Sequence, residues 1–197
     1  MIYTSNYRSV KSPEFNPISI SLDRGKDAGF NGDYIECLAP KLSFFKAYKR
    51  NKGVLSDEEN DRFYIEEYFK QVLSLLDPSE IYEMLNDRVM LCYEDNMEFC
   101  HRHVVSAWLE LFLDIDVFEV AENNGKLKIC DKPNRIKKTL EEVIRSDMVM
   151  YGFNSIRAAY LYGLSLQTDN SYLSKLLLFT ANEVEDNYII KVKKHKK

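Results

Sequence analysis

The sequence predicts an α/β fold: a small, mostly parallel sheet flanked by helices, with a mostly helical C-terminal extension that carries a β-hairpin. The first half of the chain has the order strand, strand, helices, strand, helix, which favours parallel strands joined by helices. An Asn-Gly pair between two short alternating segments predicts the hairpin. We therefore expect an α/β core over residues 1–115 and an extension over residues 116–197 that packs on it.

Each element of the core follows from a local pattern. Alternating β-branched residues mark the short strands, and helical spacing of apolar residues marks the helices. An Asp-Pro pair at residues 77–78 ends one helix and begins the next. In chain order we expect strands over residues 2–4 and 18–22, helices over 40–52, 57–76 and 78–85, a strand over 89–93 and a helix over 102–113.

The extension shows the hairpin first and helical patterns after it. In chain order we expect hairpin strands over residues 117–120 and 126–129, helices over 133–150, 155–166 and 171–180, and a last strand over 188–192. Isolated helices of this length are marginal in water, so their apolar faces need a surface to cover. We expect them to pack on one another and on the core, and any leftover apolar face to form a homodimer.

The composition is that of an ordinary globular protein. Hydrophobic residues make up 45% of the chain and the net charge is -4, which argues against broad, charge-driven binding of nucleic acid. A lysine-rich end over residues 191–197 follows an acidic block over 183–186 that offsets it, so nucleic acid is not the favoured partner. Without a long apolar run or a signal peptide, we expect a cytoplasmic protein with no membrane partner and free cysteines.

The stretch from Cys92 to His103, Cys-Tyr-Glu-Asp-Asn-Met-Glu-Phe-Cys-His-Arg-His, carries the densest chemistry in the chain. It holds two of the four cysteines and two of the three histidines, and it lies between a predicted buried strand and a predicted helix. Its reactive side chains would then gather at the carboxyl end of a strand and the amino end of a helix. That is where α/β folds bind ligands.

The first part of this motif is Cys92, Tyr93 and Glu94 at the end of the strand. Because side chains alternate along a strand, Cys92 and Glu94 face one side and Tyr93 faces the other. Cys92 in an apolar strand is more often a core residue than a catalyst. Glu94 needs a partner, and Arg102 is the natural one, either in a structural ion pair or in a functional site.

The second part of the motif is Cys100, His101 and Arg102, where the next helix begins. A thiol there, beside an arginine and the positive end of the helix dipole, has a lowered pKa. The same arginine and the free backbone donors would hold a phosphate or carboxylate. We therefore predict Cys92, Glu94, Cys100 and His101 as catalytic residues and Arg102 as an anion-binding residue.

Metal binding is a third interpretation of the motif. The cysteines and histidines offer four soft donors, but their spacing lacks the Cys-x-x-Cys and His-x-x-x-His pairs of structural zinc sites. Adjacent Cys100 and His101 are also awkward to aim at one ion from a helix start. The sequence therefore predicts no metal and no cofactor.

Polar residues also follow the first two predicted strands. Ser5, Asn6 and Tyr7 come at the end of the first strand, and Arg24 follows the second. If these strands are parallel to the third, their carboxyl ends line the same crevice. We include all four residues as anion-binding candidates, with ordinary turn chemistry as the alternative.

Short segments of the first 115 residues form a recognisable pattern, whose most specific feature is a cysteine and a glutamate, a short loop, and then Cys-His-Arg. The segments are Met1–Ser5, Pro17–Ser21 with Arg24-Gly25, Gly32–Tyr34, Leu38–Pro40, Leu91–Glu94 and Phe99–His103. They resemble the bacterial and phage family named domain of unknown function 488. The resemblance implies an α/β fold and this motif, and it implies no established reaction.

The leading hypothesis for function is an enzyme that acts on a nucleotide, a nucleic-acid base or a similar anionic metabolite. Its site would lie at the strand-to-helix junction of the motif, with a cysteine supplying a thiol and Glu94 serving as acid, base or orienting group. The alternative is a non-catalytic factor of phage or mobile-element origin that binds a nucleotide signal or a protein.

Overall fold

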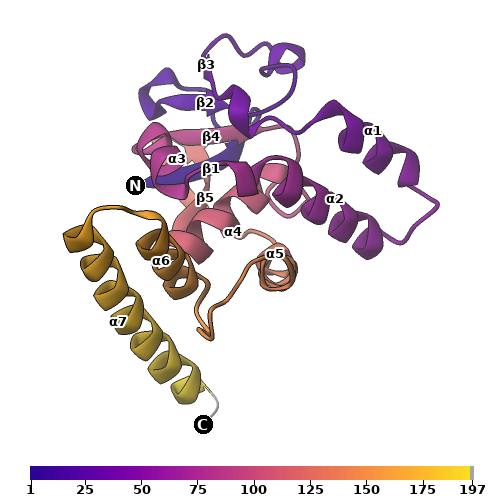
Figure 1. The fold of residues 1–197 in the computed structure, drawn as a ribbon. Coiled ribbons are helices and arrows are strands. Elements are labelled where there is room, and N and C mark those ends of the chain that lie inside the picture. The colour runs from indigo at the N-terminus through magenta and orange to yellow at the C-terminus, as the bar shows by residue number, and fades with distance from the viewer. Residues whose placement is uncertain (196–197) are drawn as a thin grey trace.

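The computed structural model describes the backbone of residues 1–195 and the side chains of residues 1–189. Within these residues the centre is a six-stranded sheet with the order β3-β2-β4-β1-β5-β6 (Figure 1). Its neighbouring strands are parallel, except that β6 runs antiparallel to β5. The strands are β1 (Ile2–Asn6), β2 (Pro17–Ser19), β3 (Asp33–Tyr34), β4 (Val89–Cys92), β5 (Val117–Asn123) and β6 (Lys126–Cys130). The predicted α/β class with a mostly parallel sheet is confirmed.

The helices match most of the predicted ones. They are α1 (Leu42–Asn51), α2 (Asp57–Gln71), α3 (Pro78–Leu85), α4 (His101–Leu113), α5 (Asn134–Asp147), α6 (Ile156–Gln167) and α7 (Ser171–His195). A capping box of Ser56 and Glu59 begins α2, and Asp77 caps α3 ahead of a proline in its first turn. The helix expected over residues 57–76 ends sooner, at Gln71, and a short 3-10 turn follows it.

The strand expected over residues 188–192 is wrong, because these residues continue α7. A short β-branched run forms a strand only beside a sheet edge, whereas α7 packs along α6 (Figure 1). The lysine-rich end over residues 191–197, with its predicted contact to nucleic acid, lies outside the described side chains.

The register of the sheet brings the carboxyl ends of three strands together. Asn6 of β1 lies opposite Cys92 of β4, and Ile18 of β2 lies opposite Met90 of β4. Strand β5 pairs in parallel with β1 and carries β6 as its hairpin partner. The hairpin that we assigned to the extension is therefore part of the central sheet, which continues past residue 115.

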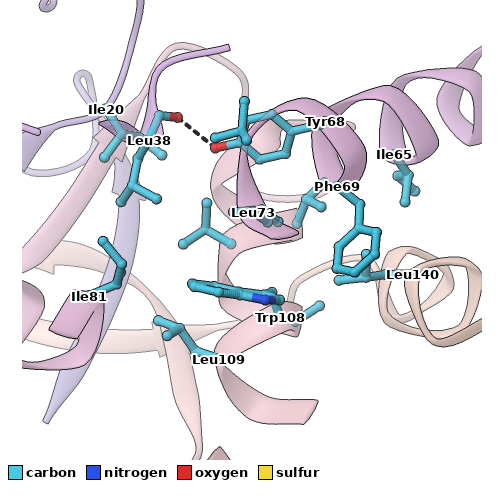
Figure 2. Close-up of a cluster of buried hydrophobic side chains, with 14 of the residues drawn as sticks. Ile20, Leu38, Ile65, Tyr68, Phe69, Leu73, Ile81, Trp108, Leu109 and Leu140 are labelled. Carbon is cyan, nitrogen blue, oxygen red and sulfur yellow. Dashed lines mark hydrogen bonds between the residues drawn. The ribbon is translucent and has the colours of Figure 1, made fainter. Parts of the chain in front are cut away.

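One face of the sheet is covered by helices. Helix α4 crosses β4, β1 and β5, and α5 and α6 pack on α4 in turn. Trp108 and Leu109 of α4 lie at the centre of this apolar core, and the buried hydroxyl of Tyr68 donates a hydrogen bond of 2.6 Å to the Leu38 carbonyl (Figure 2). The other labelled residues of the core are Ile20, Ile65, Phe69, Leu73, Ile81 and Leu140.

The opposite face of the sheet has a smaller core built from strands and loops. Its buried residues are Tyr7, Val10, Val89, Leu91 and Val120. Phe15 and Phe30, from the segments that follow β1 and β2, pack against them. Among the described residues no member of this second core lies on an α-helix.

The last two helices form a pair beyond α4. Buried residues of α6, such as Ile156 and Ala159, face the interior. Helix α7 leaves a row of large apolar side chains in solvent: Tyr172, Leu173, Leu176, Leu178 and Phe179. None of the described helices combines the length and the apolar content that crossing a membrane requires.

Candidate functional site

The motif folds as a strand, a loop and a helix, and its side chains converge. Cys92 is the last residue of β4, and Cys100 is the N-cap of α4, where its thiol makes no cap hydrogen bond. The Cys92 Sγ lies 3.5 Å from His101 Nδ1 and 3.5 Å from Glu94 Oε2. The Cys100 Sγ lies 3.9 Å from the same Nδ1. We call Cys92, Glu94, Cys100 and His101 the thiol cluster.

The imidazole of His101 is fixed from three sides. Its Nε2 lies 3.1 Å from the carbonyl oxygen of Ile20, just past β2, so that nitrogen donates, and in the neutral ring Nδ1 is then the acceptor. The ring of Tyr68 meets the imidazole edge to face at 5.8 Å. The third contact is with the two thiols, so the ring has little freedom to rotate.

Exposure and charge differ between members of the thiol cluster. Cys92, Cys100 and His101 are 3%, 2% and 6% exposed, whereas Glu94 is half-buried. Burial raises the pKa of the Cys92 thiol, and nearby Cys100 and Glu94 raise it further. The pKa of the Glu94 carboxyl is raised to about 7, mainly by burial and also by the negative charge on Cys100.

Negative charge in the thiol cluster concentrates on Cys100. Burial raises the pKa of this thiol. Hydrogen bonding to Cys92 and the positive charge of Arg102 outweigh burial, so the pKa of Cys100 is well below its usual value. Burial lowers the pKa of His101, while Cys100 and Glu94 raise it, for a net increase. These directions agree with the lowered pKa that the sequence predicts for a thiol at this helix start.

The structure brings three metal-binding donors within reach of one point. The Sγ atoms of Cys92 and Cys100 and a ring nitrogen of His101 all lie within 4.8 Å of one another. The expectation that adjacent Cys100 and His101 are awkward to aim at one ion is wrong. Cys100 has an extended backbone, with φ -148° and ψ 147°. Its side chain therefore does not point in the direction that a helical residue at this position would take.

Arg102 has a different partner from the one that the sequence predicts. Its side chain is fully buried, and its Nη2 lies 3.0 Å from Glu119 Oε1 on β5 and donates to the carbonyl of Asp95. The ion pair expected with Glu94 does not form. The reason is that β5 pairs beside β1 and places a buried carboxylate under α4, where Glu119 takes the place of Glu94 as the partner of Nη2.

Glu119 gathers a small buried network under the first turn of α4. His103 Nε2 lies 3.2 Å from Glu119 Oε2, and the Thr4 hydroxyl donates to the same oxygen. Burial raises the pKa of the Glu119 carboxyl, but His103 and Arg102 outweigh it and the pKa is lowered. Because its charge is matched inside the protein, Arg102 is not available to bind an anion from solvent in this arrangement.

A second polar cluster lies at the same edge of the sheet, on the opposite face. The Tyr7 hydroxyl lies 2.6 Å from Ser19 Oγ and 2.8 Å from Ser21 Oγ, and Ser21 donates to Asp23 at 2.9 Å. The Tyr93 hydroxyl also donates to Asp23. We call these five residues the hydroxyl network. Tyr93 and Cys92 point to opposite faces, as the alternation along the strand predicts.

The remaining predicted site residues lie outside the thiol cluster. The Ser5 hydroxyl donates to the carbonyl of Val120 across the sheet, and Asn6 Oδ1 accepts from the two backbone N–H groups of residues 8 and 9 in a tight turn. Arg24 is exposed, and its guanidinium stacks on the ring of Tyr34, 4.1 Å from the centroid. Tyr7 belongs to the hydroxyl network.

Two residues that matter at this edge were not predicted. Glu119 supports the first turn of α4. The sequence signal that could have identified it is an acidic residue at an inward-facing position of a strand whose apolar residues alternate. Arg8 follows β1, and its guanidinium is exposed and pairs with Asp95 at 2.8 Å. Its sequence position, next to Tyr7 at a strand end, was the available signal.

A hollow in the described surface lies away from both clusters. It has a volume of about 640 Å³ and is lined mainly by apolar side chains of α2, α4 and α6, among them Phe69, Trp108 and Tyr160. Its lining carries no thiol or imidazole, so we place the candidate chemistry at the thiol cluster. In comparisons with family models, curated proteins and solved structures, no match to this chain was found. The resemblance to the domain of unknown function 488 family therefore stays a prediction.

Proposed function

We propose that this protein is an enzyme that acts on a nucleotide, a nucleic-acid base or a similar anionic metabolite at the carboxyl end of β4. The observation that carries the proposal is the convergence of two thiols, an imidazole and a carboxylate from two separate elements. Such groups provide proton transfer and a nucleophile or a ligand set in one place.

The position of the thiol cluster in the sheet supports this proposal. The chain leaves β1 toward the loop-covered face and leaves β4 toward the helix-covered face. Open α/β sheets bind ligands where neighbouring strands send their connections to opposite faces. Glu94 is the half-buried member of the cluster, so it is the group that meets a substrate first.

The anionic part of the substrate needs a cation other than Arg102. Arg8 and Arg24 are exposed and follow β1 and β2 at the same edge of the sheet. The surface pair of Arg8 with Asp95 contributes little stability, so a phosphate displaces it at small cost. All four cysteines are free, which fits a reducing compartment, and we propose a cytoplasmic location.

The test begins with small molecules that co-purify with the full chain, identified by mass spectrometry. These compounds, and a pool of nucleotides and bases, are then incubated with the protein and followed for turnover. We expect Glu94→Gln to reduce turnover by about 100-fold or more. Exposed Glu83 on α3 provides the matched control Glu83→Gln, which should behave as wild type. Equal turnover by the two variants would remove Glu94 from the reaction.

A second candidate function follows from the exposed apolar row on α7. Five large apolar side chains in solvent are typical of a surface that binds another protein or a second copy of the chain. In this alternative the protein is a non-catalytic binding factor. A ligand that co-purifies but is not turned over by either wild type or Glu83→Gln would favour it.

A further inference from the structure

Distances inside the thiol cluster match the edges of a metal coordination tetrahedron. Zinc bound at about 2.3 Å from sulfur and about 2.0–2.1 Å from nitrogen places those two donors about 3.5–3.6 Å apart at the tetrahedral angle. The separations of Nδ1 of His101 from the two thiols are 3.5 Å for Cys92 and 3.9 Å for Cys100.

The orientation of His101 is the second observation. A metal-bound histidine almost always donates its other ring N–H to a carboxylate, a backbone carbonyl or a water, which fixes the ring and leaves the first nitrogen free. Nε2 of His101 has this contact with the Ile20 carbonyl at 3.1 Å, and Nδ1 faces the thiols. The carbonyl belongs to the segment after β2, so the sheet itself holds the ring in place.

Charge is the third observation. The positive charge of Arg102 is already balanced by Glu119, at 0% and 1% exposure. Ionising both Cys92 and Cys100 in the interior needs a further buried cation, because isolated buried charges are costly. One divalent ion provides that charge, and two thiolates with one imidazole are a donor set that favours zinc among the common metals.

We propose that Cys92, Cys100 and His101 bind a zinc ion through two thiolates and Nδ1. Three protein ligands leave the fourth tetrahedral position open, as in catalytic rather than structural zinc sites. Glu94 lies outside the group of three donors, with its Oε2 3.5 Å from Cys92 Sγ. As the half-buried neighbour of these ligands, it is the group that would accept a hydrogen bond from a zinc-bound water.

The catalytic part of this inference rests on the proposed function, whereas metal binding itself does not. In its catalytic part, the zinc ion is the cofactor of the proposed enzyme and polarises a water or a substrate oxygen at the open position. Zinc content and affinity are measured without any substrate. The two proposals are therefore tested by separate measurements.

The experiment uses the full chain, produced without a polyhistidine tag and purified in a reducing buffer. Metal content is measured by mass spectrometry of the elements, and zinc affinity by competition with a chromophoric chelator. We expect about one zinc ion per chain, as for a single tetrahedral site. Cys100→Ser and His101→Asn should weaken zinc binding by more than about 100-fold, since each removes a direct ligand.

Cys37→Ser is the matched control, because Cys37 is an exposed free thiol far from the cluster in sequence. It should bind zinc as tightly as wild type. If the ligand variants do not fold, cobalt(II) added to wild type reports the ligands directly through a sulfur-to-cobalt charge-transfer band. Failure of wild type to bind zinc, the lack of that band, or equal affinity of Cys100→Ser and Cys37→Ser would each overturn the zinc site. Zinc binding with no loss of turnover in Glu94→Gln would overturn only the proposed function.

Discussion

The thiol cluster and the hydroxyl network lie at the same edge of the sheet, where Cys92 ends β4 and Tyr93 follows it, yet their polar atoms have different partners. In the hydroxyl network the oxygen atoms of Tyr7, Ser19 and Ser21 are 2.6–3.2 Å apart, the range of ordinary hydrogen bonds. In the thiol cluster the contacts of sulfur with nitrogen and oxygen are 3.5–3.9 Å.

The difference separates a structural cluster from a candidate functional one. Hydroxyl groups complete one another's hydrogen bonds, so the network needs nothing from outside the protein. Two thiols around one imidazole nitrogen are also a set of metal ligands, and the proposed zinc ion would bind all three donors. A buried ion pair, Arg102 with Glu119, supports only the face that carries the thiol cluster.

The largest expected effect breaks that support. Glu119→Gln leaves the Arg102 guanidinium buried without a matching charge, which costs about 3–5 kcal/mol of unfolding free energy. Denaturant unfolding measures the loss, with exposed Glu83→Gln as the control. A change no larger than that of the control would mean that the buried pair is not needed for folding.

Removing the metal comes next and tests the comparison directly. If free zinc exceeds its dissociation constant by about 100-fold or more, a chelator lowers stability by about 3 kcal/mol and Tm by about 6–12 °C in a chain of this size. We expect the same drop for Cys37→Ser and none for Cys100→Ser, measured by thermal unfolding with and without chelator. A chelator effect that persists in Cys100→Ser would place the ion elsewhere.

A smaller effect is expected from the hydroxyl network. Tyr7→Phe removes the hydroxyl that joins Ser19 and Ser21, and the loss of such a buried hydrogen bond costs about 1–3 kcal/mol. Zinc affinity should stay unchanged, because the change lies on the other face. Tyr172→Phe, at a residue that is 76% exposed, is the control for stability. Weaker zinc binding in Tyr7→Phe would show that the two faces are coupled.

The smallest effect concerns acid sensitivity of the hydroxyl network. Burial raises the pKa of Asp23, but the Tyr93 hydroxyl, backbone N–H groups and Ser21 lower it from 3.8 to about 2. A folded-state pKa below the unfolded value stabilises the protein above about pH 4, and this stabilisation is lost as the pH falls toward 2. Denaturant unfolding at pH 3 and pH 5 should therefore show a smaller pH dependence for Asp23→Asn than for wild type. An equal dependence would assign the acid sensitivity to other carboxyls.

Local pattern was sufficient for much of the fold. The strand-loop-helix unit around the motif and the Asn-Gly hairpin follow from alternation, helical spacing and turn chemistry, which act over a few residues. The opposite directions of Cys92 and Tyr93 follow from the two-residue repeat of a strand. The strand expected over residues 188–192 was wrong, because a neighbouring helix decided the conformation of that segment.

The sequence by itself determined which residue types are available at the motif and which side of β4 each one faces. Only the tertiary structure decided their partners. Arg102 pairs with Glu119 because β5 returns beside β1, and the thiols meet His101 because the Ile20 carbonyl holds its ring. Backbone geometry fixes side-chain direction within a few residues, whereas a partner 17 or 81 residues away is set by strand order and by the packing of α4 on the sheet.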